Sequence, residues 1–277
     1  MIGFAVSFLG LLGATLIPAF FGLVAVVLLF RRSAPRYAAA FAAGVFLWYF
    51  SDTIGGSSYL GVNRGFSGGF DQAVLIVLFV AGLSLCLTDR HGFVAGEGEG
   101  REVSSLSIII IPSIVALALS VHGLSEGAAF GALASSTAGT SLIAVLGGYG
   151  PAISYVLHKM LEASMIGASY LYSFSSSFRN QVPGWTDRLR DLSILGAVFT
   201  IPSLLGISTG YYLPLNGTYP FALASGTSVY VALRLAQPLV TSAGRNSYSE
   251  SFKITLLIMS GFLSIYFAAL FHSTSTG

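Results

Sequence analysis

Two stretches of the sequence decide the fold: SVHGLSEGAAFG at residues 120–131 and YVLHKMLEAS at residues 155–164. Each holds a histidine and, four residues later, a glutamate: His122 with Glu126, and His158 with Glu162. In an α-helix this spacing puts both side chains of a pair on one face, about one turn apart. Because an ionisable group in the hydrocarbon core of a membrane costs roughly 2.5–3.5 kcal/mol, two such pairs need a partner. A divalent metal ion would serve both.

The composition is typical of a polytopic membrane protein. The chain has 277 residues, of which 54% are hydrophobic and 9% charged, and its mean hydropathy is +0.80. These values exclude an ordinary soluble globule. A net charge of +2 leaves no broad basic surface, so no nucleic acid partner is expected. The single cysteine, Cys86, excludes both a disulfide framework and a thiolate metal cluster.

Eight apolar segments are long enough to span a bilayer, each with about 20 residues or more. They fall near residues 4–30, 37–58, 71–88, 105–135, 149–174, 192–213, 220–240 and 253–272. We therefore expect an all-α polytopic membrane protein with eight transmembrane helices, folded as a single transmembrane domain over residues 1–277.

The cations between these segments predict the orientation, because Lys and Arg are retained on the cytoplasmic side. Cations follow the first, third, fifth and seventh segments: Arg31, Arg32, Arg36, Arg90, Arg101, Arg179, Arg188, Arg190, Arg245 and Lys253. The opposite linkers hold only Arg64. We expect an integral protein of the plasma (cell) membrane with both termini extracytoplasmic.

An internal repeat relates the two ends of the chain. LIPAFFGL at residues 16–23 matches TIPSLLGI at 200–207, and both place a proline four residues before a glycine. About one helix later, Gly44 and Gly226 each precede a charged residue by eight positions. The repeats would cover about 4–88 and 192–272, with central helices at about 105–174. A three-span repeat crosses the membrane an odd number of times, so this 3+2+3 arrangement has inverted repeats, as many transporters do.

The central segments carry the predicted chemistry. Two imidazoles and two carboxylates suit a four-coordinate site for Zn²⁺ and, with less preference, Fe²⁺, Mn²⁺ or Co²⁺. The lack of thiolate ligands would weaken binding, which helps a carrier release its ion. The alternative is that each pair forms only its own i,i+4 hydrogen bond inside a helix bundle.

HGLSEGAAFG, followed one segment later by HKMLEA within eight segments of 3+2+3 organisation, resembles the ZIP (Zrt/Irt-like) family of divalent metal transporters. The resemblance implies that His122, Glu126, His158 and Glu162 line one transport site near the midplane. It implies transport of a divalent cation toward the cytoplasm, Zn²⁺ first, with Fe²⁺, Mn²⁺, Co²⁺ and Cd²⁺ as alternatives. It implies no enzyme activity and no cofactor besides the transported ion, and it leaves a homodimer open.

The sequence also departs from the family pattern. Several positions where many members carry further ligands or motif residues differ here: Gly123, Ser125, Lys159, Leu161, Ile201, Arg234 and Leu235. These changes would remove the ligands of a second, adjacent ion. We therefore expect a single metal, with the Lys159 ammonium substituting for the second cation of binuclear members.

Two weaker features lie outside this site. Asp52 and Arg234 occupy equivalent repeat positions, so a buried ion pair is expected in preference to a ligand role for Asp52. The acidic, glycine-rich linker at residues 89–104 contains His91, Glu97 and Glu99. It is expected to be a solvated linker rather than a weak ion-receiving segment.

Two other functional classes remain open. An intramembrane metalloenzyme would also gather histidine and glutamate, but it needs an open coordination position and a general base. The sequence contains no HExxH motif. A sensor or scaffold that binds metal without transporting it would keep the same ligands.

Overall fold

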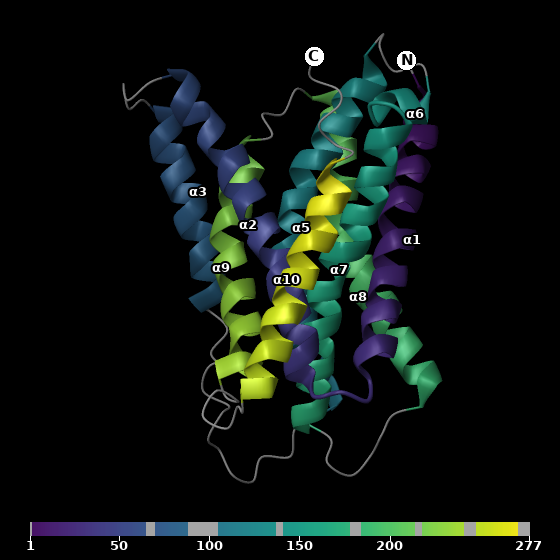
Figure 1. Cartoon of the computed structure of the whole chain (residues 1–277). Coiled ribbons are helices and arrows are strands. Elements are labelled where there is room, and N and C mark those ends of the chain that lie inside the picture. Colours follow the sequence, from purple (N-terminus) through teal and green to yellow (C-terminus); the bar gives the residue numbers. More distant parts are fainter. Residues whose placement is uncertain are drawn as a thin grey trace.

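The computed structural model describes residues 2–64, 70–87, 105–136, 141–177, 184–213, 218–240 and 248–270. Within these ranges all regular structure is α-helical (Figure 1). The helices are α1 (Phe4–Phe30), α2 (Pro35–Arg64), α3 (Phe70–Leu87), α5 (Ser105–Ser135), α6 (Leu142–Val145), α7 (Tyr149–Ser177), α8 (Trp185–Tyr212), α9 (Thr218–Val240) and α10 (Tyr248–Leu270).

A long helix lies at each of the eight segments predicted from the sequence, which confirms the all-helical class. The largest difference is at the start of α8, which begins at Trp185 instead of near residue 192. Charged residues of this first part, among them Asp187, lower its hydropathy without preventing it from being helical. The short helix α6 was not predicted. Its Ser141 side chain accepts a hydrogen bond from the Ala144 amide, an N-cap that makes so short a helix possible.

Five of the described helices are long and apolar enough to cross a membrane. They contain the candidate spans Phe4–Phe30, Pro35–Gly55, Ile109–Ser135, Trp185–Tyr212 and Tyr248–Leu270. In α3 the apolar part is shorter, Ala73–Ser84. The other two long helices, α7 and α9, carry buried polar and charged side chains, including Lys159 and Arg234, and these reduce their hydropathy.

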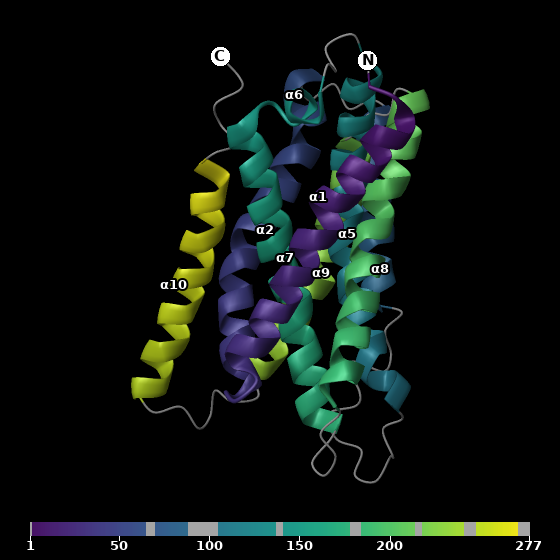
Figure 2. The same cartoon turned by 90° about the vertical axis from the view of Figure 1, so that its right-hand side faces the viewer.

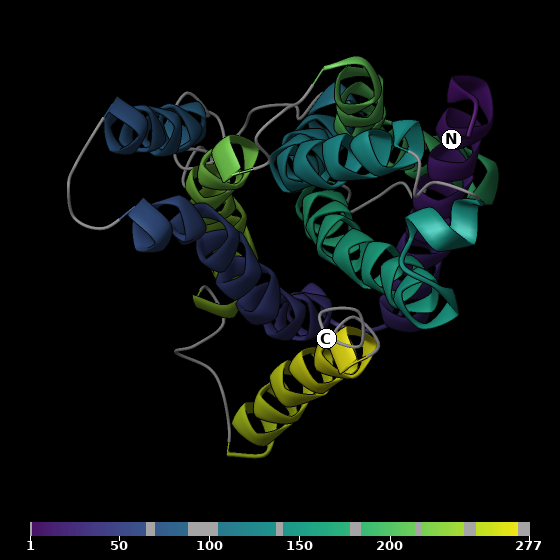
Figure 3. The same ribbon diagram turned by 90° about the horizontal axis from the view of Figure 1, so that it is seen from above.

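The long helices form two groups that lie side by side, as the view along the bundle shows (Figure 3). In the first group α5 packs on α8 and α1 packs on α7; in the second α2 packs on α10 and α3 packs on α9. The groups meet where α5 contacts α9 and where α7 contacts α2 and α10. The N-terminal end of α1 and the C-terminal end of α10 lie at the same end of the bundle (Figures 1 and 2).

Glycines bring the helices of each group into backbone contact. A Cβ at Gly127 of α5 would overlap the Ser203 carbonyl of α8, and one at Gly206 of α8 would overlap the Leu124 carbonyl of α5. The same close approach joins the other pairs through Gly22, Gly44, Gly82, Gly226 and Gly261. Small residues of this kind let membrane helices approach closely and gain van der Waals packing. Each of these contacts lies within one group.

Candidate metal centre

The candidate site lies where α5 and α7 meet inside the first helix group. His122 and Glu126 come from α5, and Lys159 and Glu162 come from α7. The i,i+4 spacing on α5 and the i,i+3 spacing on α7 put each pair on one helix face. On α5, Gly123 allows this arrangement, because a Cβ there would overlap the Ser203 hydroxyl of α8. The tight contact with α8 therefore lies beside the polar face.

Three of the four predicted ligands converge. One ligand atom each from His122, Glu126 and Glu162 can be chosen so that all three lie within 4.8 Å of one another. His122 Nε2 lies 3.1 Å from Glu126 Oε1, and the ring donates to this carboxylate. His122 and Glu162 are buried, while Glu126 is partly accessible. Such a cluster of an imidazole and two carboxylates suits Zn²⁺ and related divalent ions.

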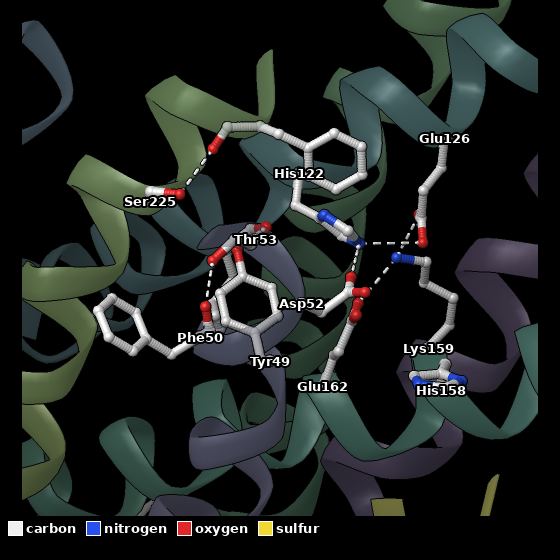
Figure 4. Close-up of polar contacts among 12 residues, drawn as sticks. Tyr49, Phe50, Asp52, Thr53, His122, Glu126, His158, Lys159, Glu162 and Ser225 are labelled. Carbon is white, nitrogen blue, oxygen red and sulfur yellow. Dashed lines mark hydrogen bonds and ion pairs between the residues drawn. The ribbon is translucent and has the colours of Figure 1, made fainter. Parts of the chain in front are cut away.

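Lys159 lies inside this cluster (Figure 4). Its Nζ is 2.5 Å from Glu126 Oε2 and 2.8 Å from Glu162 Oε2. The ammonium group therefore bridges two of the three candidate ligands, from two different helices. It contacts the Oε2 atom of each carboxylate, whereas Glu126 Oε1 accepts the bond from His122. The role of Lys159 as a substitute for a second cation stays a prediction.

Aromatic rings complete the surroundings of the Lys159 ammonium. Its Nζ lies 5.5 Å from the ring centroid of Tyr155 and 5.6 Å from that of Phe199, both within cation–π range. The Tyr155 hydroxyl is hydrogen-bonded at 2.9 Å to that of Thr15 on α1. Rings from α7 and α8 thus lie against the lysine, and α1 fixes one of these rings. Sequence reasoning missed Tyr155, although its i−4 spacing from Lys159 is a signal that could have found it.

Aromatic residues of the second helix group position His122. Tyr49 of α2 meets the imidazole edge-on with ring centroids 5.5 Å apart, and its hydroxyl donates to the Leu119 carbonyl of α5 at 2.9 Å. Phe221 of α9 meets the same ring at 4.9 Å. These contacts hold the imidazole between the groups. Tyr49 stands three residues before Asp52, a helical spacing that places both on the face toward α5.

His158 lies outside the ligand cluster. Its Nδ1 donates to the Ser154 carbonyl at 3.1 Å, and its ring packs against Trp48 of α2 with centroids 4.4 Å apart. Figure 4 shows it away from the Glu126 and Glu162 carboxylates. The structure therefore brings together His122, Glu126 and Glu162, and it does not bring His158 to them.

The structure also separates Asp52 from Arg234. Asp52 Oδ2 lies 3.8 Å from His122 Nε2. Arg234 instead donates through Nε to the Tyr230 hydroxyl at 3.1 Å and through Nη1 to Gln237 Oε1 at 3.2 Å. Within the described part of the chain, Asp52 and Arg234 form no ion pair. The expectation was wrong because repeat-equivalent positions on two helices need not face each other, and Asp52 of α2 faces α5.

The linker at residues 89–104, with His91, Glu97 and Glu99, lies outside the described residues. Its predicted character stays a prediction.

Comparisons with known proteins add no family assignment. No family model matches the chain, and no curated protein matches it.

Proposed function

We propose that this protein transports a divalent metal cation, Zn²⁺ first, across the plasma membrane toward the cytoplasm. The transport site would be formed by His122, Glu126 and Glu162, with Lys159 as a fixed counter-cation. His158 stays a predicted fourth ligand, which would have to leave its contacts with Ser154 and Trp48 to join the others. The protein would act without catalysis and without a cofactor.

The observation that carries this proposal is the convergence of His122, Glu126 and Glu162 from two helices of a membrane protein. Ionisable side chains inside a membrane bundle are costly and mark ion pathways more often than structural contacts. The structural alternative is that each His/Glu pair forms only an i,i+4 hydrogen bond within its own helix. That alternative would not require the glutamates of two helices to lie close together. The α5 pair forms such a bond, and its Glu126 also contacts Lys159 of α7.

The helix packing supports a transporter with inverted repeats. If α1, α2 and α3 correspond to α8, α9 and α10, and α5 to α7, then the α1–α7 contact corresponds to the α8–α5 contact. In the same way α2–α10 corresponds to α9–α3, and α2–α7 to α9–α5, and all of these contacts are observed. Gly22 and Gly206, matched in the sequence repeat, both meet the backbone of a central helix. Repeats of this kind place the substrate at their interface.

Uptake of isotopic Zn²⁺ into vesicles that contain the purified protein tests the proposal. We expect time-dependent uptake that saturates with Zn²⁺ and is lost in Glu126→Gln, with Asp187→Asn as the matched control. Asp187 is an exposed acid in the first turn of α8, so its loss makes the same charge change away from the site. Uptake that is equal in the wild type and in Glu126→Gln would contradict the proposal.

One observation favours a second candidate, a scaffold or sensor that does not transport. Lys159 already compensates the Glu126 and Glu162 carboxylates, as a purely structural ion-pair network would. This candidate predicts no flux under any gradient. A sensor would still bind Zn²⁺ at the site, whereas a scaffold would not, so equilibrium binding separates these two.

A further inference from the structure

We propose that Asp52 of α2 is a further ligand of the same metal ion, contributed from the opposite helix group, and the ligand that an entering ion meets first. This inference rests on the proposed function. It concerns how the ligand set is completed and from which side the ion arrives.

The positions of the carboxylates around His122 Nε2 are the first reason to regard Asp52 as a ligand. This atom has two carboxylate neighbours: Glu126 Oε1 at 3.1 Å and Asp52 Oδ2 at 3.8 Å (Figure 4). Two ligands at about 2.0–2.1 Å from a tetrahedral zinc ion lie about 3.4 Å from each other. The two observed distances lie on either side of this value. A metal ion on His122 Nε2 would therefore be within reach of both carboxylates after small side-chain shifts.

The contact between Asp52 and His122 has no other evident role. At 3.8 Å it is longer than a hydrogen bond. It leaves the Asp52 carboxylate close to the imidazole but not bonded to it. Tyr49, one turn before Asp52, is by contrast fixed by its hydrogen bond to the Leu119 carbonyl. That bond holds α2 against α5, and it keeps the carboxylate of Asp52 beside the site.

The net charge of the cluster is the second reason to regard Asp52 as a ligand. Glu126 and Glu162 provide two negative charges, and Lys159 cancels one of them. The remaining single charge cannot neutralise a divalent ion inside a low-dielectric bundle, where an uncompensated charge is costly. The Asp52 carboxylate restores the balance, because three carboxylates and one ammonium match one divalent cation. The presence of Lys159 thus creates a need for an additional acid.

The exposure of the ligand side chains indicates which of them an entering ion meets first. The Asp52 side chain is 40% exposed and that of Glu126 is 22% exposed. His122, Glu162 and Lys159 are exposed by 5%, 2% and 1%. The exposed fraction of the proposed ligands therefore decreases from the accessible carboxylate of Asp52 to the buried one of Glu162. An ion that enters from the accessible side contacts Asp52 before it reaches Glu162.

Zn²⁺ binding to the purified full-length protein, measured by titration calorimetry, tests the inference. We expect Asp52→Asn to lower the affinity by at least about tenfold while one ion still binds, and Asp187→Asn to leave it unchanged. Asp52→Glu, which keeps the carboxylate, should recover most of the affinity. Asp52→Asn combined with Lys159→Met should bind more tightly than Asp52→Asn alone, because the pair of changes restores the net charge.

Co²⁺ provides a readout that reports coordination directly. If Asp52 is a ligand, the visible absorption bands of bound Co²⁺ should change in Asp52→Asn and remain unchanged in Asp187→Asn. Wild-type affinity together with a wild-type Co²⁺ spectrum in Asp52→Asn would overturn the inference. If that variant does not fold, an unchanged spectrum in Asp52→Glu would overturn it equally, since a longer ligand must shift the ion.

The two proposals fail in different ways. If the wild type binds neither Zn²⁺ nor Co²⁺, the proposed function fails. If Glu126→Gln abolishes binding but Asp52→Asn leaves it intact, only the role of Asp52 is refuted.

Discussion

At the scale of single residues, Lys159 organises the candidate metal centre. Its ammonium group contacts a carboxylate from α5 and one from α7, and two aromatic rings lie against it. A buried ion pair of this kind is weak evidence for stability, because desolvation offsets much of the attraction. Removing one partner is nevertheless expensive, since the other charges remain buried. Lys159 therefore links the stability of the bundle to the ligands of the proposed ion.

The first prediction concerns Lys159→Met in the absence of metal. We expect it to lower the free energy of unfolding by about 3–5 kcal/mol, the usual cost of breaking a buried pair. Added Zn²⁺ should raise the Tm of this variant more than that of the wild type, because the ion compensates the two free carboxylates. Thermal unfolding in detergent, with and without Zn²⁺, measures both effects. Lys253→Met, at an exposed lysine of α10, is the control. Equal Zn²⁺ shifts in variant and wild type would contradict the prediction.

The second prediction separates the two histidines. His122 lies in the ligand cluster, whereas His158 packs on Trp48 and bonds to the Ser154 carbonyl. We expect His122→Ala to abolish stoichiometric Zn²⁺ binding and His158→Ala to reduce affinity by less. The bound metal per protein, measured by elemental analysis after gel filtration, decides between them. Equal loss in both variants would mean that His158 is a full ligand, as the sequence predicts.

At the scale of the helices, the sequence predicted where the helices lie in the chain well, but it predicted poorly which neighbours their side chains face. Hydropathy and span length located each of the eight long helices in the part of the chain that the structure describes, because the cost of exposing backbone to lipid forces apolar segments into helices. The i,i+4 spacing correctly grouped His122 with Glu126. It could not predict that Asp52 faces His122 or that His158 faces Trp48. Those contacts depend on the rotation of each helix about its axis, which tertiary packing sets.

The third prediction concerns the glycine contacts between α5 and α8. A methyl group at Gly127 would overlap the Ser203 carbonyl, so Gly127→Ala must push the helices apart. We expect a loss of about 1–3 kcal/mol, the usual cost of overpacking, and a lower Tm in detergent. Gly13→Ala on α1 is the matched control, because nothing lies within 4 Å of a Cβ there. It should be neutral or stabilise the helix by up to about 1 kcal/mol. Similar Tm values for the two variants would refute this packing.

At the scale of the whole molecule, the contacts differ within and between the two helix groups. Glycines fix backbone against backbone inside each group, at α5–α8, α1–α7, α2–α10 and α3–α9. Side chains make the contacts between the groups, such as Thr227 to the Ala118 carbonyl at 2.8 Å and Ser154 to the Ala268 carbonyl at 2.7 Å. Single hydrogen bonds can be exchanged with little cost, whereas backbone packing cannot slide without steric overlap. We therefore expect relative motion to cost least at the boundary between the groups.

The fourth prediction follows from this boundary. In a background with Cys86 replaced, a cysteine pair at Ala118 and Thr227 joins the groups, and a pair at Leu16 and Gly196 joins α1 to α8 within one group, away from the candidate site. Both pairs are bridged with a short bifunctional thiol reagent. We expect the first bridge to stop Zn²⁺ uptake into vesicles and leave equilibrium Zn²⁺ binding intact, because the ligands of α5 and α7 are not disturbed. The second bridge should leave both unchanged. If uptake continues with Ala118 and Thr227 fully bridged, the groups do not move against each other there, and the ion must cross by motions inside one group.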